Sequence, residues 1–337
     1  MSAIDVEKLL QAVSDDSPCG EDLEYDPAFQ ELERAATPDV GSSMVGDEVA
    51  PEPPKWRDVG RLAENVLERS KDLRAVMFLT AARANTHGIK GLADGIALIN
   101  GLLSEYWDDV HPRLDEEDDN DPTMRINSLA GLGDPDGIVK DLRNSHIVAG
   151  QRAGSYSLHD IRIASGELPA PEGVEAPEFG IIEAAFQEIE LDDLQALADA
   201  VAKATDDLRA VETQITEKVG AANNSLDVDA LAAELNAISK IYAQQLANRG
   251  VDVEDSGDAT EEVAQRAISG EITSREDAVR MLDKVSEYFR RHEPSSPVPY
   301  LLQRAKGLVA KDFMEILQDL TPDAIAQAEM YTKSRQD

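Results

Sequence analysis

The chain has 337 residues and a formal net charge of −35, from 67 acidic and 32 basic residues. This charge argues against a surface that binds nucleic acid or anionic membranes, because phosphate binding requires clustered Lys and Arg. Hydrophobic residues make up 42% of the chain and charged residues 29%, which is typical of globular domains, and the length is sufficient for two or three of them.

The sequence also indicates a compartment. The single cysteine, Cys19, cannot form an internal disulfide, which fits a reducing environment. The first ten residues lack a basic region followed by an apolar run, so no signal peptide is predicted. No run of about 18 uninterrupted apolar residues is present, so we expect no membrane insertion. These features predict a cytoplasmic protein.

Apolar residues recur at helical spacing through residues 1–165, which predicts a helical N-terminal domain. The longest pattern, Ser70 to Leu129, predicts a helical hairpin that turns at His87–Gly88 and closes at Trp107. The segment Tyr156–Ile161 is either a short extended piece or a helix start, and no run predicts a convincing strand. Further helices are expected at about 6–13, 26–36, 56–69, 124–132 and 138–142.

The middle of the chain is predicted to form a separate helical hairpin. A Pro-, Gly- and Glu-rich segment, residues 165–178, marks the first expected domain boundary. Residues 180–249 follow, with one helical pattern over 182–219 and a second that begins at Leu231. Residues 250–270 are acidic and weakly apolar, which is typical of a linker.

Residues 271–337 predict a small helical C-terminal oligomerisation domain, so the expected fold class is all-α throughout. This segment carries 12 acidic and 10 basic residues, whereas the chain before it carries 55 and 22. Nearly all of the excess negative charge therefore lies before residue 271. A nearly neutral surface suits self-association, because it avoids the repulsion that an acidic surface would meet in a second copy.

A loop rich in proline joins two predicted helices of this domain, at about 278–289 and 300–309. Proline fixes its own φ and restricts the residue before it, so the loop is pre-ordered. The adjacent pair Arg290–Arg291 either ends the first helix, where cations favour the dipole, or contacts a neighbouring subunit. The residues expected at an oligomer interface are Met281, Val285, Phe289, Arg290, Arg291, Pro294, Pro297, Leu301 and Leu302.

No catalytic, cofactor-binding or metal-binding residue is predicted. The acidic run Asp115–Asp121 suggests calcium, but an EF-hand loop counted from Asp115 would need Gly and Glu where Asn120 and Ile126 stand. A solvated turn that precedes a helix explains the run better. None of the five histidines lies in a metal-binding spacing, and Cys19 has no histidine near it in sequence, so a buried structural thiol is expected.

Three segments resemble a known family. PCGEDLEYDPAFQELE at Pro18–Glu33, SKDLRAVMFLTAA at Ser70–Ala82, and GL…GLLSEYWDDVHPRLDEEDDNDPTMRINSL at Gly91–Leu129 are similar to the ImpA N-terminal domain. That domain marks the TssA proteins of the bacterial type VI secretion system. Residues 274–323 resemble the C-terminal domain of shorter TssA members, whereas residues 180–270 show no such resemblance.

The resemblance implies a non-enzymatic cytoplasmic assembly protein of a Gram-negative bacterium. TssA proteins form rings or star-like oligomers through the C-terminal domain and associate with the baseplate, the inner tube and the contractile sheath, whose assembly they prime or coordinate. A monomeric adaptor and a metal-dependent hydrolase are the alternatives, and no cofactor is expected. The residues expected to contact apparatus partners are Glu21, Asp22, Tyr25, Trp107, His111 and Asp115.

Overall fold

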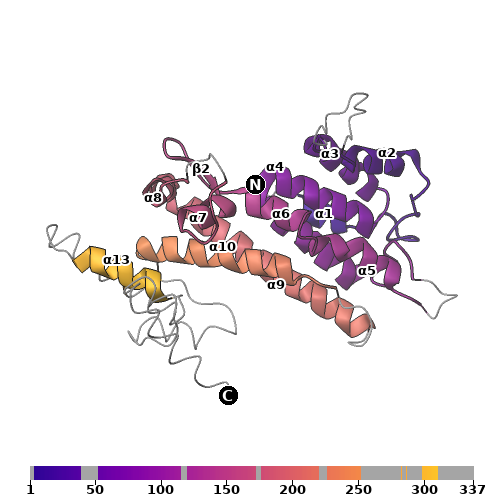
Figure 1. The fold of residues 1–337 in the computed structure, drawn as a ribbon. Helices are drawn as coiled ribbons and strands as arrows, with labels where there is room; N and C mark the ends of the chain where they lie inside the picture. Colours follow the sequence, from indigo (N-terminus) through magenta and orange to yellow (C-terminus); the bar gives the residue numbers. More distant parts are fainter. Residues whose placement is uncertain are drawn as a thin grey trace, which may run out of the picture. The chain divides into compact units, whose positions relative to one another are not determined.

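A computed structural model of the chain describes residues 4–38, 52–114, 120–171, 176–219, 226–251, 282, 286 and 298–309. The chain divides into two compact units, Met1–Glu254 and Asp255–Asp337. Helix α13 is described in the second unit, and all the other elements belong to the first (Figure 1). No helix among the described residues is long and apolar enough to cross a membrane.

Helices dominate the described residues, as the sequence predicts. The exception is a two-stranded antiparallel sheet. In chain order, the elements are α1 (Val6–Leu10), α2 (Pro27–Ala36), α3 (Trp56–Leu67), α4 (Leu73–Tyr106), α5 (Thr123–Leu129), the 3₁₀ turn η2 (Ala130–Leu132), α6 (Ile138–Asn144), β1 (His146–Gly150), β2 (Gly154–Ser157), α7 (Leu158–Ala164), α8 (Phe179–Glu188), α9 (Leu191–Val219), α10 (Asp229–Asn248) and α13 (Val298–Val309).

Helix α4 is the predicted hairpin, folded back on itself at Gly88. That residue has φ 60° and ψ −139°, a backbone conformation that glycine adopts at little cost. The two halves lie so close that a Cβ on Gly91 would overlap the carbonyl oxygen of Arg83. A Cβ on Gly95 would likewise stand 2.5 Å from the Thr80 hydroxyl oxygen. The small residues of the second half therefore set the spacing between the halves.

Most of the first unit packs around this hairpin. Helices α1, α3, α5, α6 and α9 all contact α4, and α2 contacts α3. Their apolar faces form one continuous core with the buried stripe of α4, in which Leu79, Leu92, Ile96 and Leu98 are fully buried. Burial of that apolar surface is the main force that holds the unit together.

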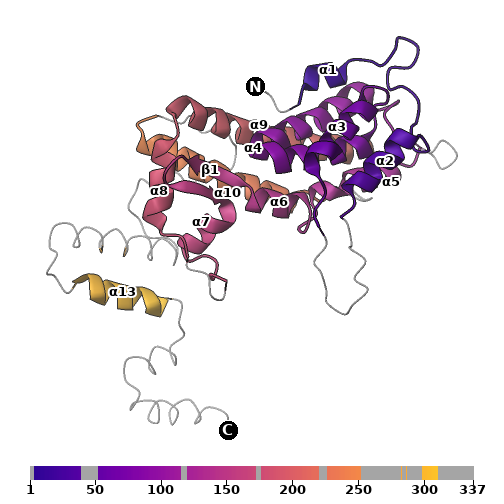
Figure 2. The ribbon, with the colours of Figure 1, turned by 90° about the horizontal axis from the view of Figure 1, so that it is seen from above.

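Helices α9 and α10 form an antiparallel pair that runs along the hairpin (Figures 1 and 2). Three hydrogen bonds tie α9 to the second half of α4. Asn100 Nδ2 donates to Asp207 Oδ1 at 2.8 Å, Gln214 Nε2 donates to Asn100 Oδ1 at 2.6 Å, and Ser104 Oγ donates to Gln214 Oε1 at 3.2 Å. Residues 180–249, predicted as a separate middle domain, thus share one core with residues 1–165.

The predicted continuous helix over 182–219 is instead two helices, α8 and α9. No Gly or Pro marks the break, which is stabilised from elsewhere in the chain. Arg249, at the end of α10, donates one hydrogen bond to the carbonyl of Ile189 at 2.7 Å and another to the carbonyl of Phe186. These bonds add side-chain donors to the carbonyls at the end of α8, where the Phe186 carbonyl also accepts from the backbone N–H of Ile189.

The expectation that no strand is present is wrong, because β1 and β2 pair as a short hairpin. Ile147 and Val148 are the β-branched, buried residues of β1, and Tyr242 on α10 donates to the Ile147 carbonyl at 2.8 Å. After β2, Ser157 starts α7 with a capping box completed by Asp160. The segment Tyr156–Ile161 therefore contains both a short extended piece, the end of β2, and a helix start, the first turn of α7.

We predict that Gly91→Ala lowers the stability of the chain by about 1–3 kcal/mol, because the added methyl group must push the two halves of α4 apart. The matched control is Gly60→Ala in α3, where an added Cβ would meet its nearest atom at an ordinary 3.5 Å. That change should be neutral or stabilising by up to about 1 kcal/mol. Urea unfolding followed by circular dichroism measures both. Equal effects of the two substitutions would contradict the close approach of the helix halves.

Candidate functional site

The segment Pro18–Asp26, here called the 18–26 loop, is fixed to the core through its backbone. The N–H of Lys71 donates to the Cys19 carbonyl at 2.8 Å, and Gly20 forms an isolated antiparallel bridge with Ser70. His111 Nε2 lies 3.2 Å from the Gly20 carbonyl oxygen. The loop is therefore anchored at the point where α4 begins and where the chain leaves the hairpin.

Arg74 binds two acidic side chains of the same loop and the buried Asp72. Its guanidinium lies 3.2 Å from the Asp22 carboxylate, 2.9 Å from that of Glu24 and 2.7 Å from that of Asp72. Its central carbon stands 4.8 Å from the centre of the Phe29 ring. Burial lowers the pKa of Arg74, but the hydrogen bonds that it donates to Asp72 and Glu24 outweigh that effect and raise the pKa above its ordinary value. These side-chain contacts hold the 18–26 loop in place in addition to its backbone hydrogen bonds.

Tyr25 projects from this fixed loop and is 85% exposed. The next residue, Asp26, is held by Arg69 at 2.7 Å and accepts a hydrogen bond from the first turn of α2. The hydrogen bond from Arg69 holds the pKa of the Asp26 carboxyl below its usual value. Glu21 and Asp22 are also exposed. Three of the predicted partner-contacting residues thus lie together on one anchored surface.

Two other predicted partner-contacting residues, Trp107 and His111, lie in the interior. Trp107 is 9% exposed, and its ring has Arg125 over it at 4.9 Å and Lys218 at 5.5 Å. His111 is 1% exposed and contacts the 18–26 loop as described above. His111 thus supports the 18–26 loop, and Trp107 packs against Arg125. The remaining candidate, Asp115, lies outside the described residues.

Sequence analysis missed Arg125, a fully buried arginine on α5. Its guanidinium donates to three backbone carbonyls, those of Pro112 at 2.7 Å, Val110 at 2.8 Å and Trp107. Burial lowers the pKa of Arg125 to about 10, so the side chain remains charged at neutral pH. Its helical spacing from Leu129 could have indicated an inward side chain, because i and i+4 share a face.

Cys19 is a buried thiol, as expected. It is 1% exposed, and burial raises its pKa to about 11. The thiolate is the reactive form of cysteine, so this shift suppresses nucleophilic chemistry at neutral pH.

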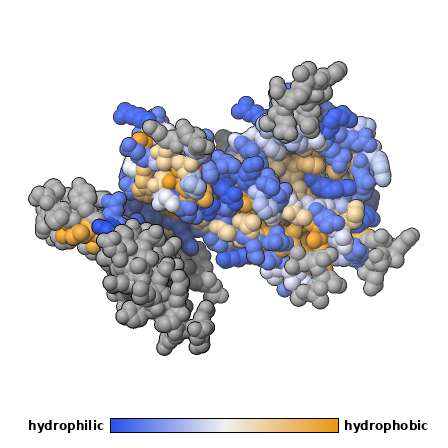
Figure 3. Space-filling model, viewed as in Figure 1, coloured by the Kyte–Doolittle hydropathy of each residue, from blue (hydrophilic) through white to orange (hydrophobic). Residues whose placement is uncertain are grey.

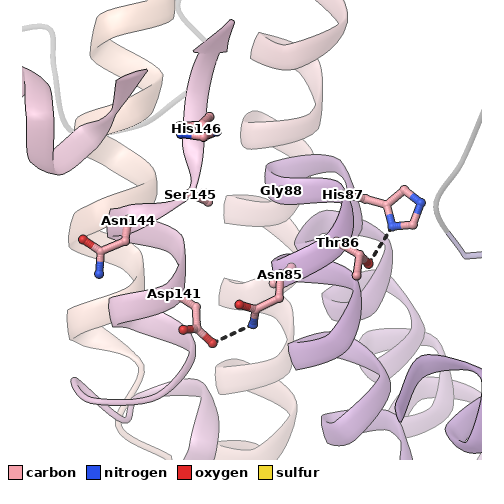
Figure 4. A pocket seen from close by; sticks show the side chains of 9 residues that line it. Asn85, Thr86, His87, Gly88, Asp141, Asn144, Ser145 and His146 are labelled. Atoms are coloured by element: carbon pink, nitrogen blue, oxygen red, sulfur yellow. Dashed lines mark hydrogen bonds between the residues drawn. The ribbon is translucent and has the colours of Figure 1, made fainter. Parts of the chain in front are cut away.

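A groove of about 400 Å³ lies where the tip of the α4 hairpin meets the end of α6 and the start of β1. Figure 4 shows Asn85 on α4 and Asp141 on α6 pointing toward each other across it. The amide nitrogen of Asn85 donates to a carboxylate oxygen of Asp141 at 2.7 Å. The lining of the groove is mainly polar and comprises Ala84, Asn85, Thr86, His87, Gly88, Asp141, Asn144, Ser145 and His146.

The hydroxyl groups of this groove are engaged in hydrogen bonds to the backbone. Thr86 Oγ1 donates to the Ala82 carbonyl at 2.7 Å, and Ser145 Oγ donates to the Leu142 carbonyl at 2.9 Å. Thr86 Oγ1 also lies 2.9 Å from His87 Nδ1, but its proton is already used in the bond to Ala82. This geometry serves recognition better than nucleophilic catalysis, which needs a hydroxyl that donates to its base. No group of three potential metal ligands occurs among the described residues.

An apolar surface lies over α7 and α8 on the face seen in Figure 3. Phe179 and Ile181 of α8 are 47% and 43% exposed. In the second unit, Leu301 of α13 is 64% exposed, and Leu302 is half-buried. The other predicted oligomer-interface residues, Met281, Val285, Phe289, Arg290, Arg291, Pro294 and Pro297, lie outside the described residues.

Comparisons with known proteins agree with the segments on which the resemblance rests. Residues 10–134 match the family model described as ImpA, N-terminal, type VI secretion system. The chain is 41% identical over 341 residues to the type VI secretion system component TssA1 of Pseudomonas aeruginosa, covering 97% of both chains.

One solved structure has the same fold over most of its length. It is the N-terminal domain, including the conserved ImpA_N region, of the TssA component of the type VI secretion system from Burkholderia cenocepacia. The TM-score is 0.58 at 23% sequence identity, and the match covers 75% of this chain and 97% of that one.

We predict that Arg74→Gln destabilises the chain by about 3–5 kcal/mol, because it leaves the carboxylate of Asp72 buried without its cation. The substitution should also make the 18–26 loop more sensitive to proteolysis. The control is Arg61→Gln, which removes an exposed ion pair with Asp58 at 4.0 Å and should change stability by less than about 1 kcal/mol. Thermal unfolding and limited proteolysis test both variants. An Arg74→Gln chain as stable as the control would show that the cluster does not anchor the loop.

Proposed function

This chain belongs to the TssA family of type VI secretion system components, and we propose that it acts there as a non-enzymatic structural subunit. In this proposal, residues 271–337 hold copies of the chain in a ring-like homo-oligomer in the cytoplasm. The first unit then contacts baseplate, inner-tube and contractile-sheath proteins and primes or coordinates their assembly.

The observation that carries the proposal is the division of charge between the two ends of the chain. Before residue 271 there are 55 acidic and 22 basic residues, whereas residues 271–337 carry 12 and 10. Copies brought together through the acidic end would repel one another, and copies brought together through the nearly neutral end would not. The exposed Leu301 on α13 gives that end an apolar side chain available for burial.

The 18–26 loop is the part of the first unit best suited to contact an apparatus partner. A bound loop loses conformational entropy, and this loop is already ordered by the backbone bonds to Ser70 and Lys71 and by the Arg74 cluster. Tyr25 offers a large, rigid side chain with a polar end, a residue type enriched at the centres of protein interfaces.

We predict that Arg290→Glu together with Arg291→Glu disrupts the oligomer and leaves the helical content nearly unchanged. In the proposal, the two arginines meet acidic groups of a neighbouring subunit, so reversing their charge turns attraction into repulsion. Light scattering coupled to size exclusion gives the particle mass, and circular dichroism gives the helicity. The control with equal charge change is Arg34→Glu together with Arg61→Glu, two exposed residues of the first unit.

Three results of that experiment are informative. A wild-type mass in the Arg290/Arg291 variant would mean that the pair only ends a helix. A fall in both helical content and particle mass would show that the two arginines stabilise the fold of the subunit itself. A single-chain mass for the wild-type protein would favour the alternative function of a monomeric adaptor.

We predict that Tyr25→Ala weakens binding to at least one of the purified baseplate, tube and sheath proteins of the same organism by tenfold or more. Truncating a central aromatic residue of an interface typically costs about 2 kcal/mol or more, which corresponds to such a change. Biolayer interferometry with each protein measures it, and Met124→Ala, at a residue that is 55% exposed, serves as the control. Unchanged affinity for all three proteins would contradict the proposal that the 18–26 loop contacts an apparatus partner.

A further inference from the structure

We propose that the groove between the α4 tip and α6 binds a cationic side chain, Lys or Arg, of a partner protein. The choice of a partner protein rests on the proposed function, whereas the cation specificity rests on the groove itself. The volume of about 400 Å³ is within the range of small-ligand sites and is large enough for a guanidinium or ammonium group with its alkyl stem.

Asp141 supplies the charge for such a site. Its side chain is half-buried in the groove wall and forms no ion pair with any described residue. The neighbouring cations are directed elsewhere, since Arg143 binds Glu234 at 2.8 Å and Lys140 is exposed. The hydrogen bond from Asn85 uses one of about four acceptor positions of the carboxylate, so the group can accept further donors.

One helix end adds to the negative potential. Helix α6 ends at Asn144, whereas at Gly88 the first half of α4 ends and the second half begins, so the opposite helix dipoles there offset each other. Both residues line the groove. The last carbonyls of a helix lack intrahelical partners and carry about half a negative charge, which favours a cation nearby.

The same features argue against other ligands. An anion would meet the Asp141 carboxylate and the C-terminus of α6, which are both negative. A mainly apolar ligand would leave the polar groups of the lining without partners, because amides, hydroxyls, imidazoles and a carboxylate form the larger part of it. The side-chain amides of Asn85 and Asn144 can orient a guanidinium through hydrogen bonds to their oxygen atoms.

The first test is saturation-transfer NMR on the full-length protein with N-acetyl-arginine amide as the probe. We expect transfer to the arginine side-chain protons with the wild-type protein and at least fivefold less with Asp141→Asn. This substitution removes the charge but keeps an oxygen that can accept from Asn85. Asp136→Asn, which removes an exposed carboxylate five residues away, should retain the wild-type signal. N-acetyl-norleucine amide, which has an alkyl chain without the charge, should give none.

A second pair of variants consists of one that introduces a cation into the groove and one that introduces a cation elsewhere. Asn144→Arg places a guanidinium within the lining and should abolish probe transfer, whereas Asn127→Arg, at an exposed position of α5, should not. Equal transfer in wild-type and Asp141→Asn protein would overturn the inference. Equal losses in Asp141→Asn and Asp136→Asn would also overturn it, because they would show that bulk charge attracts the probe.

The source of the cation is tested by the affinities of the purified baseplate, tube and sheath proteins for the same variants. We expect Asp141→Asn, but not Asp136→Asn, to weaken at least one of them tenfold or more. Probe binding that depends on Asp141 with no change in any partner affinity would assign the groove to a free cationic molecule and overturn the partner assignment. Light scattering on the same samples tests the proposed oligomer separately, so failure of one proposal does not imply failure of the other.

Discussion

The close approach of the two halves of α4 is the constraint on which the rest of the first unit depends. Gly91 and Gly95 allow the backbone of one half to rest against Arg83 and Thr80 of the other. Helices α1, α3, α5, α6 and α9 then pack on the surfaces of this hairpin. Because the hairpin turns at Gly88 and closes near His111, it also determines where the groove and the 18–26 loop lie, at its opposite ends.

Buried charges in this unit are stabilised in three different ways. Arg125 donates to backbone carbonyls and lies over the Trp107 ring, Arg74 binds three carboxylates, and Glu234 of α10 accepts from Arg143 of α6 and Arg162 of α7. Each arrangement joins segments that are distant in sequence. Removing one member would leave a partner in a low-dielectric interior, which is more costly than the bond itself is favourable. These clusters therefore specify how the helices are arranged, in addition to the apolar core.

Helical periodicity in the sequence was sufficient to predict the hairpin, its turn at Gly88 and most helices near their observed positions. The break between α8 and α9 was not predictable, because Arg249, some sixty residues away, stabilises it. Periodicity also could not show that residues 180–249 share a core with residues 1–165. In the candidate sites, sequence indicated the exposed Tyr25 but placed the interior Trp107 and His111 with it. An aromatic or imidazole side chain serves a contact surface or a core equally well, and only tertiary packing distinguishes the two.

The hydrogen bonds from Asn100 to Asp207 and from Gln214 to Asn100 have a mechanical consequence. An apolar seam between helices tolerates sliding, since one leucine can replace another at the next turn. Here, a slide of one helical turn, about 5.4 Å, would separate these three half-buried side chains from one another and break both hydrogen bonds. These bonds therefore fix the position of α9 along the second half of α4.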